Sequence, residues 1–218
     1  MKKKTAFILV GLPGCGKGTN GKRYVAEASD HPIHYIETGD LLRRRCTIDR
    51  EFAEKWQPAM NAGKILPNHV LNELAYQKID ELLADRDFIF DGYPRTLGQA
   101  QYIVSLMREV HRYELVTVFF ELRDKSAVID RIRKRSLAES DPLRPDKPEN
   151  EKHNQQVIRR ADDKIEIVVN RIREFDNEFP TLDPYLRENT TYVVVSADNP
   201  PDIVFSHFSQ HIMAYAGK

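Results

Sequence analysis

Short apolar runs alternate with longer, partly polar segments along this chain of 218 residues. Five apolar runs are typical of buried strands, at residues 5–10, 33–37, 88–90, 115–122 and 191–195. The other segments have the composition of helices, one of which begins near Leu41, with others at residues 16–28, 51–62, 67–84, 97–112, 125–135 and 202–214. Strands that read as continuous apolar runs and alternate with helices form parallel sheets covered on both faces. The pattern therefore predicts an α/β fold.

Two stretches do not fit this alternation. Residues 38–73 place more chain between the second and third strands than a simple crossover needs, and Thr38 or Asp40 is expected to cap the helix near Leu41. Residues 136–159 are polar and contain prolines, so they bury too little apolar surface to hold one conformation by themselves. In this second stretch we expect a mobile flap or a loop that a ligand orders.

The totals narrow the classes of partner. Lysine plus arginine and aspartate plus glutamate both number 33, so the formal net charge is zero. There is thus no bulk electrostatic argument for a nucleic acid or a membrane as partner. Two cysteines, Cys15 and Cys46, are too few for a disulfide framework or a zinc cluster, and no apolar stretch approaches a membrane span. We expect a soluble, cytoplasmic monomer without zinc.

A glycine-rich loop, Gly11–Thr19, lies between the first strand and the first helix. It has the spacing of a phosphate-binding loop up to Lys17, but continues with Gly18 before the hydroxyl of Thr19. Its glycines let the backbone turn N–H groups inward, and the N-terminus of the following helix favours an anion. Strand, loop and helix in this order predict a nucleotide phosphate site, with a plain glycine-rich turn as the alternative.

Polar residues also follow the second and third strands, at Thr38-Gly39-Asp40 and at Asp91-Gly92-Tyr93-Pro94-Arg95. In open α/β sheets ligands bind beyond the carboxyl ends of the strands, so both stretches are expected to face the phosphate loop. Two carboxylates beside a triphosphate, Asp40 and Asp91, favour Mg²⁺ held through water, since Mg²⁺ dehydrates reluctantly. Either aspartate alone is equally typical of a helix cap or a turn.

Arginines are the other candidate phosphate ligands, because a guanidinium binds two phosphate oxygens at once. Taken singly, each is more often a solvated surface residue. The candidates that follow strand ends or flank the polar stretch are Arg43, Arg95, Arg131, Arg135, Arg160 and Arg171.

The order of these motifs resembles the adenylate kinase family of nucleoside monophosphate kinases, from about Phe7 to Phe208. The phosphate loop is similar to that family's loop, including its Gly-Thr ending. Residues 38–43, 63–66 and 91–100 resemble its acceptor-site motifs, and residues 130–135 and 160–171 the two borders of its lid.

The resemblance implies a three-layer P-loop fold with a five-stranded parallel sheet of order 2-3-1-4-5. The implied core comprises residues 1–36, 74–131 and 172–218, with an AMP-binding insert at 37–73 and a lid at 132–171. The four-cysteine metal cluster that some long lids carry is missing here, so no zinc is expected.

The implied activity is reversible, Mg-dependent transfer of the γ-phosphoryl group of ATP to AMP, giving two ADP. The implied ATP-binding residues are Gly14, Cys15, Gly16, Lys17, Gly18, Thr19, Arg131, Arg135 and Asn199. The implied AMP-binding residues are Thr38, Arg43, Lys64, Ile65, Leu66, Gly92, Tyr93, Arg95, Gln99, Arg160 and Arg171. The implied catalytic residues are Lys17, Arg95, Arg131, Arg135, Arg160 and Arg171, and no general base is required.

Two other functions stay open. UMP/CMP kinases are similar to this chain but tend to differ at the positions of Thr38 and Gln99, whose hydroxyl and amide match the edges of adenine. A nucleotide-binding regulatory protein with an inactive kinase site would lack Lys17 or some of the arginines, and all of them are present.

Overall fold

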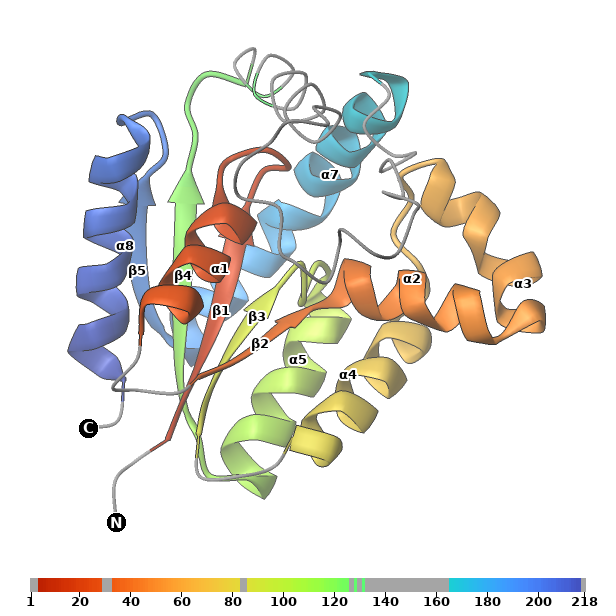
Figure 1. Ribbon diagram of the computed structural model, residues 1–218, viewed down its shortest axis with the longest axis horizontal. Coiled ribbons are helices and arrows are strands. Elements are labelled where there is room, and N and C mark those ends of the chain that lie inside the picture. The colour runs from red at the N-terminus through yellow and green to blue at the C-terminus, as the bar shows by residue number, and fades with distance from the viewer. Residues whose placement is uncertain are drawn as a thin grey trace.

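The computed structural model describes residues 4–28, 33–82, 86–125, 128, 131 and 165–216. In these ranges one sheet is built from five strands (Figure 1): β1 Thr5–Gly11, β2 Ile33–Glu37, β3 Asp87–Asp91, β4 Glu114–Glu121 and β5 Thr191–Ser196. Their order across the sheet is β2-β3-β1-β4-β5, and every neighbouring pair is parallel. The predicted α/β class and strand order are confirmed.

The central strand β1 connects the two apolar cores. Its side chains at positions 6, 8 and 10 face one core, whereas Phe7 and Leu9 face the other. All seven residues of the strand are buried. Burial on both faces explains why the strand reads as an unbroken apolar run. Because β1 is the middle strand, its carboxyl end at Gly11 lies in the middle of the sheet edge, where ligands bind in such folds.

Helices cover both faces and complete three layers (Figure 1). One face carries α1 (Lys17–Glu27) and α8 (Pro201–Tyr215), which meet where Tyr24 packs edge-on against Phe208 at 6.0 Å. The other face carries α4 (Asn68–Leu82), α5 (Leu97–Ser105) with its π-helical extension η1 (Leu106–Val110), and α7 (Ile165–Asn189).

The connection from β2 to β3 also holds α2 (Thr38–Ile48) and α3 (Arg50–Asn61), which extend beyond the sheet in Figure 1. Helix α2 begins at Thr38, directly after β2, and not near Leu41. Neither predicted cap caps it: its N-cap is Glu37, and the hydroxyl of Thr38 donates to the carbonyl of Gly92 at 2.9 Å. The predicted cap was wrong because the hydroxyl bonds across the sheet edge instead.

Helix α7, with 25 residues, is not predicted from the sequence pattern. It contains Pro180 and Pro184, each of which removes a backbone hydrogen bond from a helix. Leu182 and Leu186 are buried against the core, and this packing stabilises the helix despite the prolines. Of the predicted helix at 125–135 only residues 125, 128 and 131 are described, and the polar stretch 136–159 lies outside the described residues.

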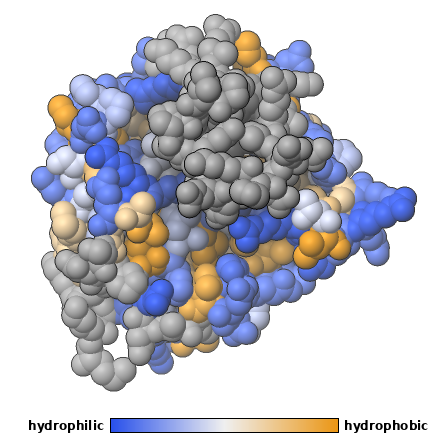
Figure 2. All heavy atoms as spheres, in the orientation of Figure 1, coloured by the Kyte–Doolittle hydropathy of each residue, from blue (hydrophilic) through white to orange (hydrophobic). Residues whose placement is uncertain are grey.

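Three features of the described residues concern a membrane, the exposed surface and the two cysteines. Within the described ranges no helix combines the length and the apolar content that crossing a bilayer requires. On the side drawn in Figure 2, hydrophobic residues form small groups among hydrophilic ones. Cys15 and Cys46 are free thiols, so no disulfide joins them.

Candidate active site

The phosphate loop joins β1 to α1 with backbone geometry that its glycines allow. Gly11, Gly14 and Gly16 have φ angles of 145°, 75° and 98°, which other residues rarely adopt. A Cβ on Gly11 would lie 2.6 Å from the carbonyl oxygen of Phe120. Gly16 is the N-cap of α1, and no side chain from the described part of the chain caps this helix. The N–H groups of its first turn are thus available to an anion.

Lys17 lies against the loop that it follows. Its Nζ donates to the carbonyl oxygens of Gly11 (2.7 Å) and Leu12 (2.9 Å), and lies 3.4 Å from Sγ of Cys15. Cys15 is buried, so its thiol fills the loop, whereas Thr19 is exposed. Backbone oxygens therefore hold the ammonium group inside the curve of the loop.

Asp91, at the end of β3, lies next to the first turn of α1. A Cβ on Gly18 would lie 2.9 Å from Oδ2 of Asp91, so a glycine here lets the carboxylate approach the helix backbone. The hydroxyl of Tyr35 donates to the same oxygen at 2.7 Å. Burial and the charge of Asp91 raise the pKa of Tyr35, so its hydroxyl stays a neutral donor at neutral pH. This contact accounts for the glycine at position 18 of the loop.

The residues after Asp91 form a second polar turn. Gly92 has a φ of 77°, and a Cβ there would lie 2.9 Å from a terminal nitrogen of Arg95 and 3.0 Å from the hydroxyl oxygen of Thr38. The carbonyl of Gly92 accepts hydrogen bonds from Thr38 (2.9 Å) and from Nε of Arg95 (2.7 Å). Tyr93 is fully buried and donates to Asn72 at 2.7 Å, so its side chain holds α4 in place.

Arg95 is surrounded by charged groups. Burial and the guanidinium of Arg171 lower its pKa, the carboxylates of Asp91 and Glu37 oppose that shift, and Arg43 lowers it further. The residue as a whole is exposed to solvent, although protein atoms crowd its guanidinium group. Three guanidinium groups near one another attract anions.

Arg43 is held by two carboxylates. One of its terminal nitrogens donates to Oε1 of Glu37 at 3.1 Å and to Oδ1 of Asp40. The other carboxylate oxygen of Glu37 pairs with Nζ of Lys22, on α1, at 2.7 Å. Burial disfavours the charged form of Asp40, but the hydrogen bond and charge of Arg43, with Lys22, lower its pKa overall. Asp40 is thus an ionised partner of Arg43.

Gln99 is fully buried near the start of α5. Its Oε1 accepts from the backbone N–H of Arg95 at 2.8 Å, and its own N–H donates to the capping hydroxyl of Thr96 at 3.2 Å. Within the described residues Nε2 of Gln99 has no hydrogen-bond partner. Buried polar groups are almost always paired, so this nitrogen is a donor available to a ligand.

The loop after α3 contacts α7. Gly63 has a φ of 73°, and a Cβ there would lie 2.7 Å from the carbonyl oxygen of Ile167 and 3.2 Å from Cγ of Arg171. Asn170 donates to the carbonyl of Ala62 at 3.2 Å. These contacts bring Arg171 to the loop that carries three predicted AMP-binding residues: Lys64, Ile65 and Leu66.

The predicted donor-side residues that can be placed lie at the end of β5. Arg131 donates to the carbonyl of Ala197 at 3.0 Å, and the side chain of Asn199 lies 3.5 Å from the carbonyl oxygen of Ser196. Because parallel strands end at one edge, these residues share that edge with the phosphate loop. Arg135 and Arg160 lie outside the described residues.

Three residues at the site, Lys22, Tyr35 and Glu37, are not singled out by the sequence motifs. Tyr35 and Glu37 are two positions apart on β2, and Glu37 is the register partner of Asp91. Polar residues at alternate positions of a short strand mark one polar face, which is a signal present in the sequence. Lys22 carries no such signal, because its pairing with Glu37 depends on how α1 packs.

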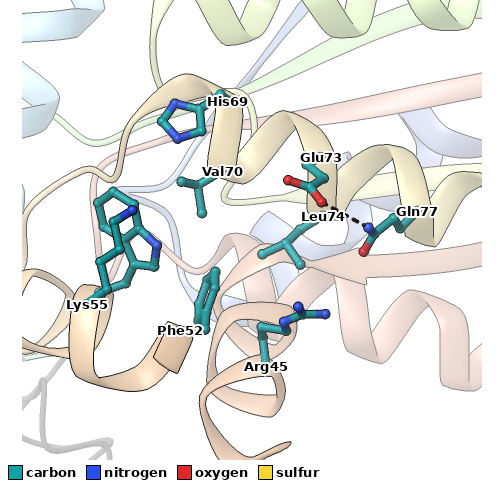
Figure 3. A pocket seen from close by; sticks show the side chains of 9 residues that line it. Arg45, Phe52, Lys55, His69, Val70, Glu73, Leu74 and Gln77 are labelled. Carbon is teal, nitrogen blue, oxygen red and sulfur yellow. Dashed lines mark hydrogen bonds between the residues drawn. The ribbon is translucent and has the colours of Figure 1, made fainter. Parts of the chain in front are cut away.

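A separate pocket of about 150 Å³ lies between α2, α3 and α4 (Figure 3). Its lining includes Phe52, Trp56 and Glu73, and no predicted site residue. Glu73 accepts a hydrogen bond from Gln77 at 3.2 Å, which Figure 3 shows as a dashed line. This carboxylate is thus already partnered by a residue of its own helix.

Comparisons with known proteins agree with the motifs. The model of the family described as "Adenylate kinase" matches residues 9–190. An adenylate kinase of Mycoplasma capricolum is 30% identical over 201 residues, covering 88% of this chain and 92% of the relative. Similar proteins of the same name occur in Fervidobacterium nodosum (30% over 197 residues, 86% and 88% covered) and in Methanosarcina acetivorans (29% over 217 residues, 96% and 99% covered).

Proposed function

The chain belongs to the adenylate kinase family, and from that premise we propose that it transfers the γ-phosphoryl group of Mg·ATP reversibly to AMP, giving two ADP. The observation that carries the proposal is the meeting of two anion sites at one sheet edge. Asp91 connects them, because its carboxylate approaches Gly18 of the phosphate-loop helix and its backbone leads into the turn of Arg95. A donor phosphate and an acceptor phosphate can therefore lie side by side.

The chemistry requires charge stabilisation more than proton transfer. A nucleotide phosphate has a second pKa of about 6, so the acceptor oxygen is already anionic at neutral pH. The transition state spreads negative charge over the transferring group and the two oxygens in line with it. We assign the stabilisation of that charge to four cationic side chains. These are Lys17 on the donor side, Arg43 and Arg95 on the acceptor side, and Arg171 between them.

Mg²⁺ is part of this proposal, and Asp91 fits it better than Asp40. Mg²⁺ in kinase sites is held by one or two carboxylates and by substrate phosphates, with several waters kept. Oδ2 of Asp91 accepts from Tyr35, while its Oδ1 accepts no hydrogen bond from the described residues. Asp40 is paired with Arg43. When bound, the metal would neutralise charge on the β- and γ-phosphates.

The acceptor base is assigned from Gln99. Its buried Nε2, which has no hydrogen-bond partner among the described residues, supplies a donor, and adenine offers ring nitrogens that accept. Thr38, the first residue of α2, is also buried and is bonded to Gly92, in the turn whose Arg95 bonds to Gln99. Together the hydroxyl of Thr38 and the amide of Gln99 match the edges of adenine, and UMP/CMP kinases tend to differ at both positions, which supports AMP as acceptor.

The two inserts of the proposed enzyme have different roles. We assign residues 37–73 to AMP binding and residues 132–171 to the lid that excludes water from the transferring phosphate, since water would otherwise accept it. We also propose that the enzyme acts as a monomer. The two free thiols support a reducing compartment such as the cytoplasm.

A coupled assay of ADP formation tests the proposal. Mg·ATP is supplied with AMP, UMP, CMP or GMP in parallel, for the wild type, for Lys17→Ala and for Lys55→Ala. Of the four acceptors, we expect the wild type to turn over AMP only. We expect Lys17→Ala to lower kcat by roughly 10² to 10³, and Lys55→Ala, at an exposed residue on α3, to leave kcat unchanged.

Other outcomes would reassign the chain. Preference for UMP or CMP would keep the mechanism and make the protein a UMP/CMP kinase. Tight ATP binding without transfer to any acceptor would instead favour an inactive nucleotide-binding regulatory protein.

A further inference from the structure

A negative side chain stands at the acceptor phosphate site. Glu37 ends β2 and keeps its carboxylate largely buried, with 13% of the side chain exposed. This carboxylate lies 3.1 Å from a terminal nitrogen of Arg43, the arginine that we assign to the AMP phosphate. It therefore occupies a position from which it attracts the same cation as the substrate does.

The hydrogen-bond geometry makes this competition direct. A terminal guanidinium nitrogen has two hydrogens, and in Arg43 that nitrogen is bonded both to Glu37 and to Asp40. A phosphate that binds a guanidinium through two oxygens needs hydrogens from two neighbouring nitrogens. To use this terminal nitrogen of Arg43, the phosphate must displace a carboxylate or share the nitrogen with it.

Charge adds to the geometry. The second carboxylate oxygen of Glu37 pairs with Lys22, so the glutamate stays fixed between α1 and α2. Glu37 also acts electrostatically on Arg95, the second arginine assigned to the acceptor phosphate. An incoming phosphate with two negative charges is therefore repelled by this buried carboxylate, whose pairing with Lys22 and Arg43 compensates its charge in part.

We propose that Glu37 is an affinity-determining residue that weakens AMP binding by competing with the AMP phosphate for Arg43. This inference rests on the proposed function and deepens it. The effect on affinity is expected for AMP and not for ATP, because the ATP phosphates are assigned to the phosphate loop after β1, whereas Glu37 ends β2. Glu37 thereby keeps the acceptor site unsaturated at AMP concentrations that would otherwise fill it.

Steady-state kinetics of the full chain test this inference, with AMP varied at saturating Mg·ATP and then the reverse. Glu37→Gln keeps the side-chain length and an acceptor oxygen but removes the charge. We expect it to lower KM for AMP roughly tenfold, with KM for ATP unchanged. Glu51→Gln makes the same change on exposed α3 and is expected to match the wild type.

Two further variants extend the test. Glu37→Asp keeps the charge and is expected to retain the wild-type KM for AMP within about threefold, whereas a purely structural role predicts a large change. Lys22→Met removes the exposed compensating cation and is expected to raise KM for AMP, the opposite sign to Glu37→Gln. It also keeps the inference testable if Glu37→Gln does not fold.

The outcomes separate the inference from the proposed function. Inactivity of the wild type with AMP would overturn the proposed function. An active wild type whose Glu37→Gln variant has an unchanged or raised KM for AMP would overturn the inference and make Glu37 a positioning residue for Arg43. A fall in KM for both nucleotides would also overturn it, because the effect would then not be confined to the acceptor. Calorimetric titration with AMP alone gives the same comparison without turnover.

Discussion

The hydroxyl of Tyr35 on β2 donates a 2.7 Å hydrogen bond to Oδ2 of Asp91 at the end of β3. The bond links neighbouring strands and fixes the orientation of the carboxylate beside Gly18. The other oxygen, Oδ1, accepts no hydrogen bond from the described residues. Tyr35 thus orients the carboxylate that we assign to Mg²⁺.

Replacing Tyr35 with phenylalanine removes this donor and keeps the ring. The carboxylate loses its fixed orientation, so we expect a higher Mg²⁺ concentration for half-maximal activity, and a loss of stability of about 1 kcal/mol. Activity is measured against Mg²⁺ concentration. Tyr192→Phe is the matched control, because it removes a tyrosine–aspartate bond to Asp183 far from the site and should leave the Mg²⁺ dependence unchanged.

Gly18→Ala places a methyl group 2.9 Å from Oδ2 of Asp91. The carboxylate has to move, and we expect kcat to fall by roughly 10² as this preorganised group is displaced. Alanine is also a better helix former than glycine, by about 1 kcal/mol, so thermal stability should not fall with the activity. Unchanged kcat together with normal folding would show that the close approach is not needed for turnover.

Gln99→Leu removes the buried amide and keeps most of its volume. We expect KM for AMP to rise roughly tenfold or more, with little change in KM for ATP, because a lost hydrogen bond to the base affects only the acceptor. The variant also loses the bond to the N–H of Arg95, and its stability should fall by about 1 to 3 kcal/mol. Steady-state assays with AMP varied and then with ATP varied measure the effect. An equal rise of both KM values would assign Gln99 to packing alone.

His34 is expected to make stability depend on pH. Burial lowers its pKa in the folded chain, helped by the charges of Arg86 and Lys78. As the pH falls through about 6.5, the unfolded chain therefore binds a proton before the folded chain does, and stability falls. Thermal unfolding at pH 7.5 and 5.5 should show a smaller difference for His34→Gln than for the wild type. His211, whose pKa is also lowered, keeps part of the dependence in that variant.

The fold follows from the sequence where one physical cause dominates. Strands β1 and β3 are buried along their whole length and read as apolar runs, and glycines mark the turn from β1 into α1, so both features are predicted correctly. Helix α7 is missed because Pro180 and Pro184 oppose helix locally, while its stability comes from packing on distant strands. The start of α2 is misplaced because the hydroxyl of Thr38 bonds to a residue that is remote in sequence.

At the site, too, contacts between residues that are remote in sequence are not predicted. Motifs identify residues such as Lys17 and Gln99, because each lies at a fixed distance along the chain from other residues of its motif. The pairing of Glu37 with Lys22 and Arg43 depends on how β2, α1 and α2 pack, and no local pattern contains that information. The assignments of Arg135 and Arg160 stay predictions.

The hydrogen bond from Asn170 to the carbonyl of Ala62 has a mechanical consequence. It joins the loop that carries the proposed AMP residues to the first turns of α7, and the next residue on that helix is Arg171. A displacement of this loop would therefore strain a bond to the helix turn that carries Arg171. The position of the loop and the position of Arg171 are thus connected through a single side chain.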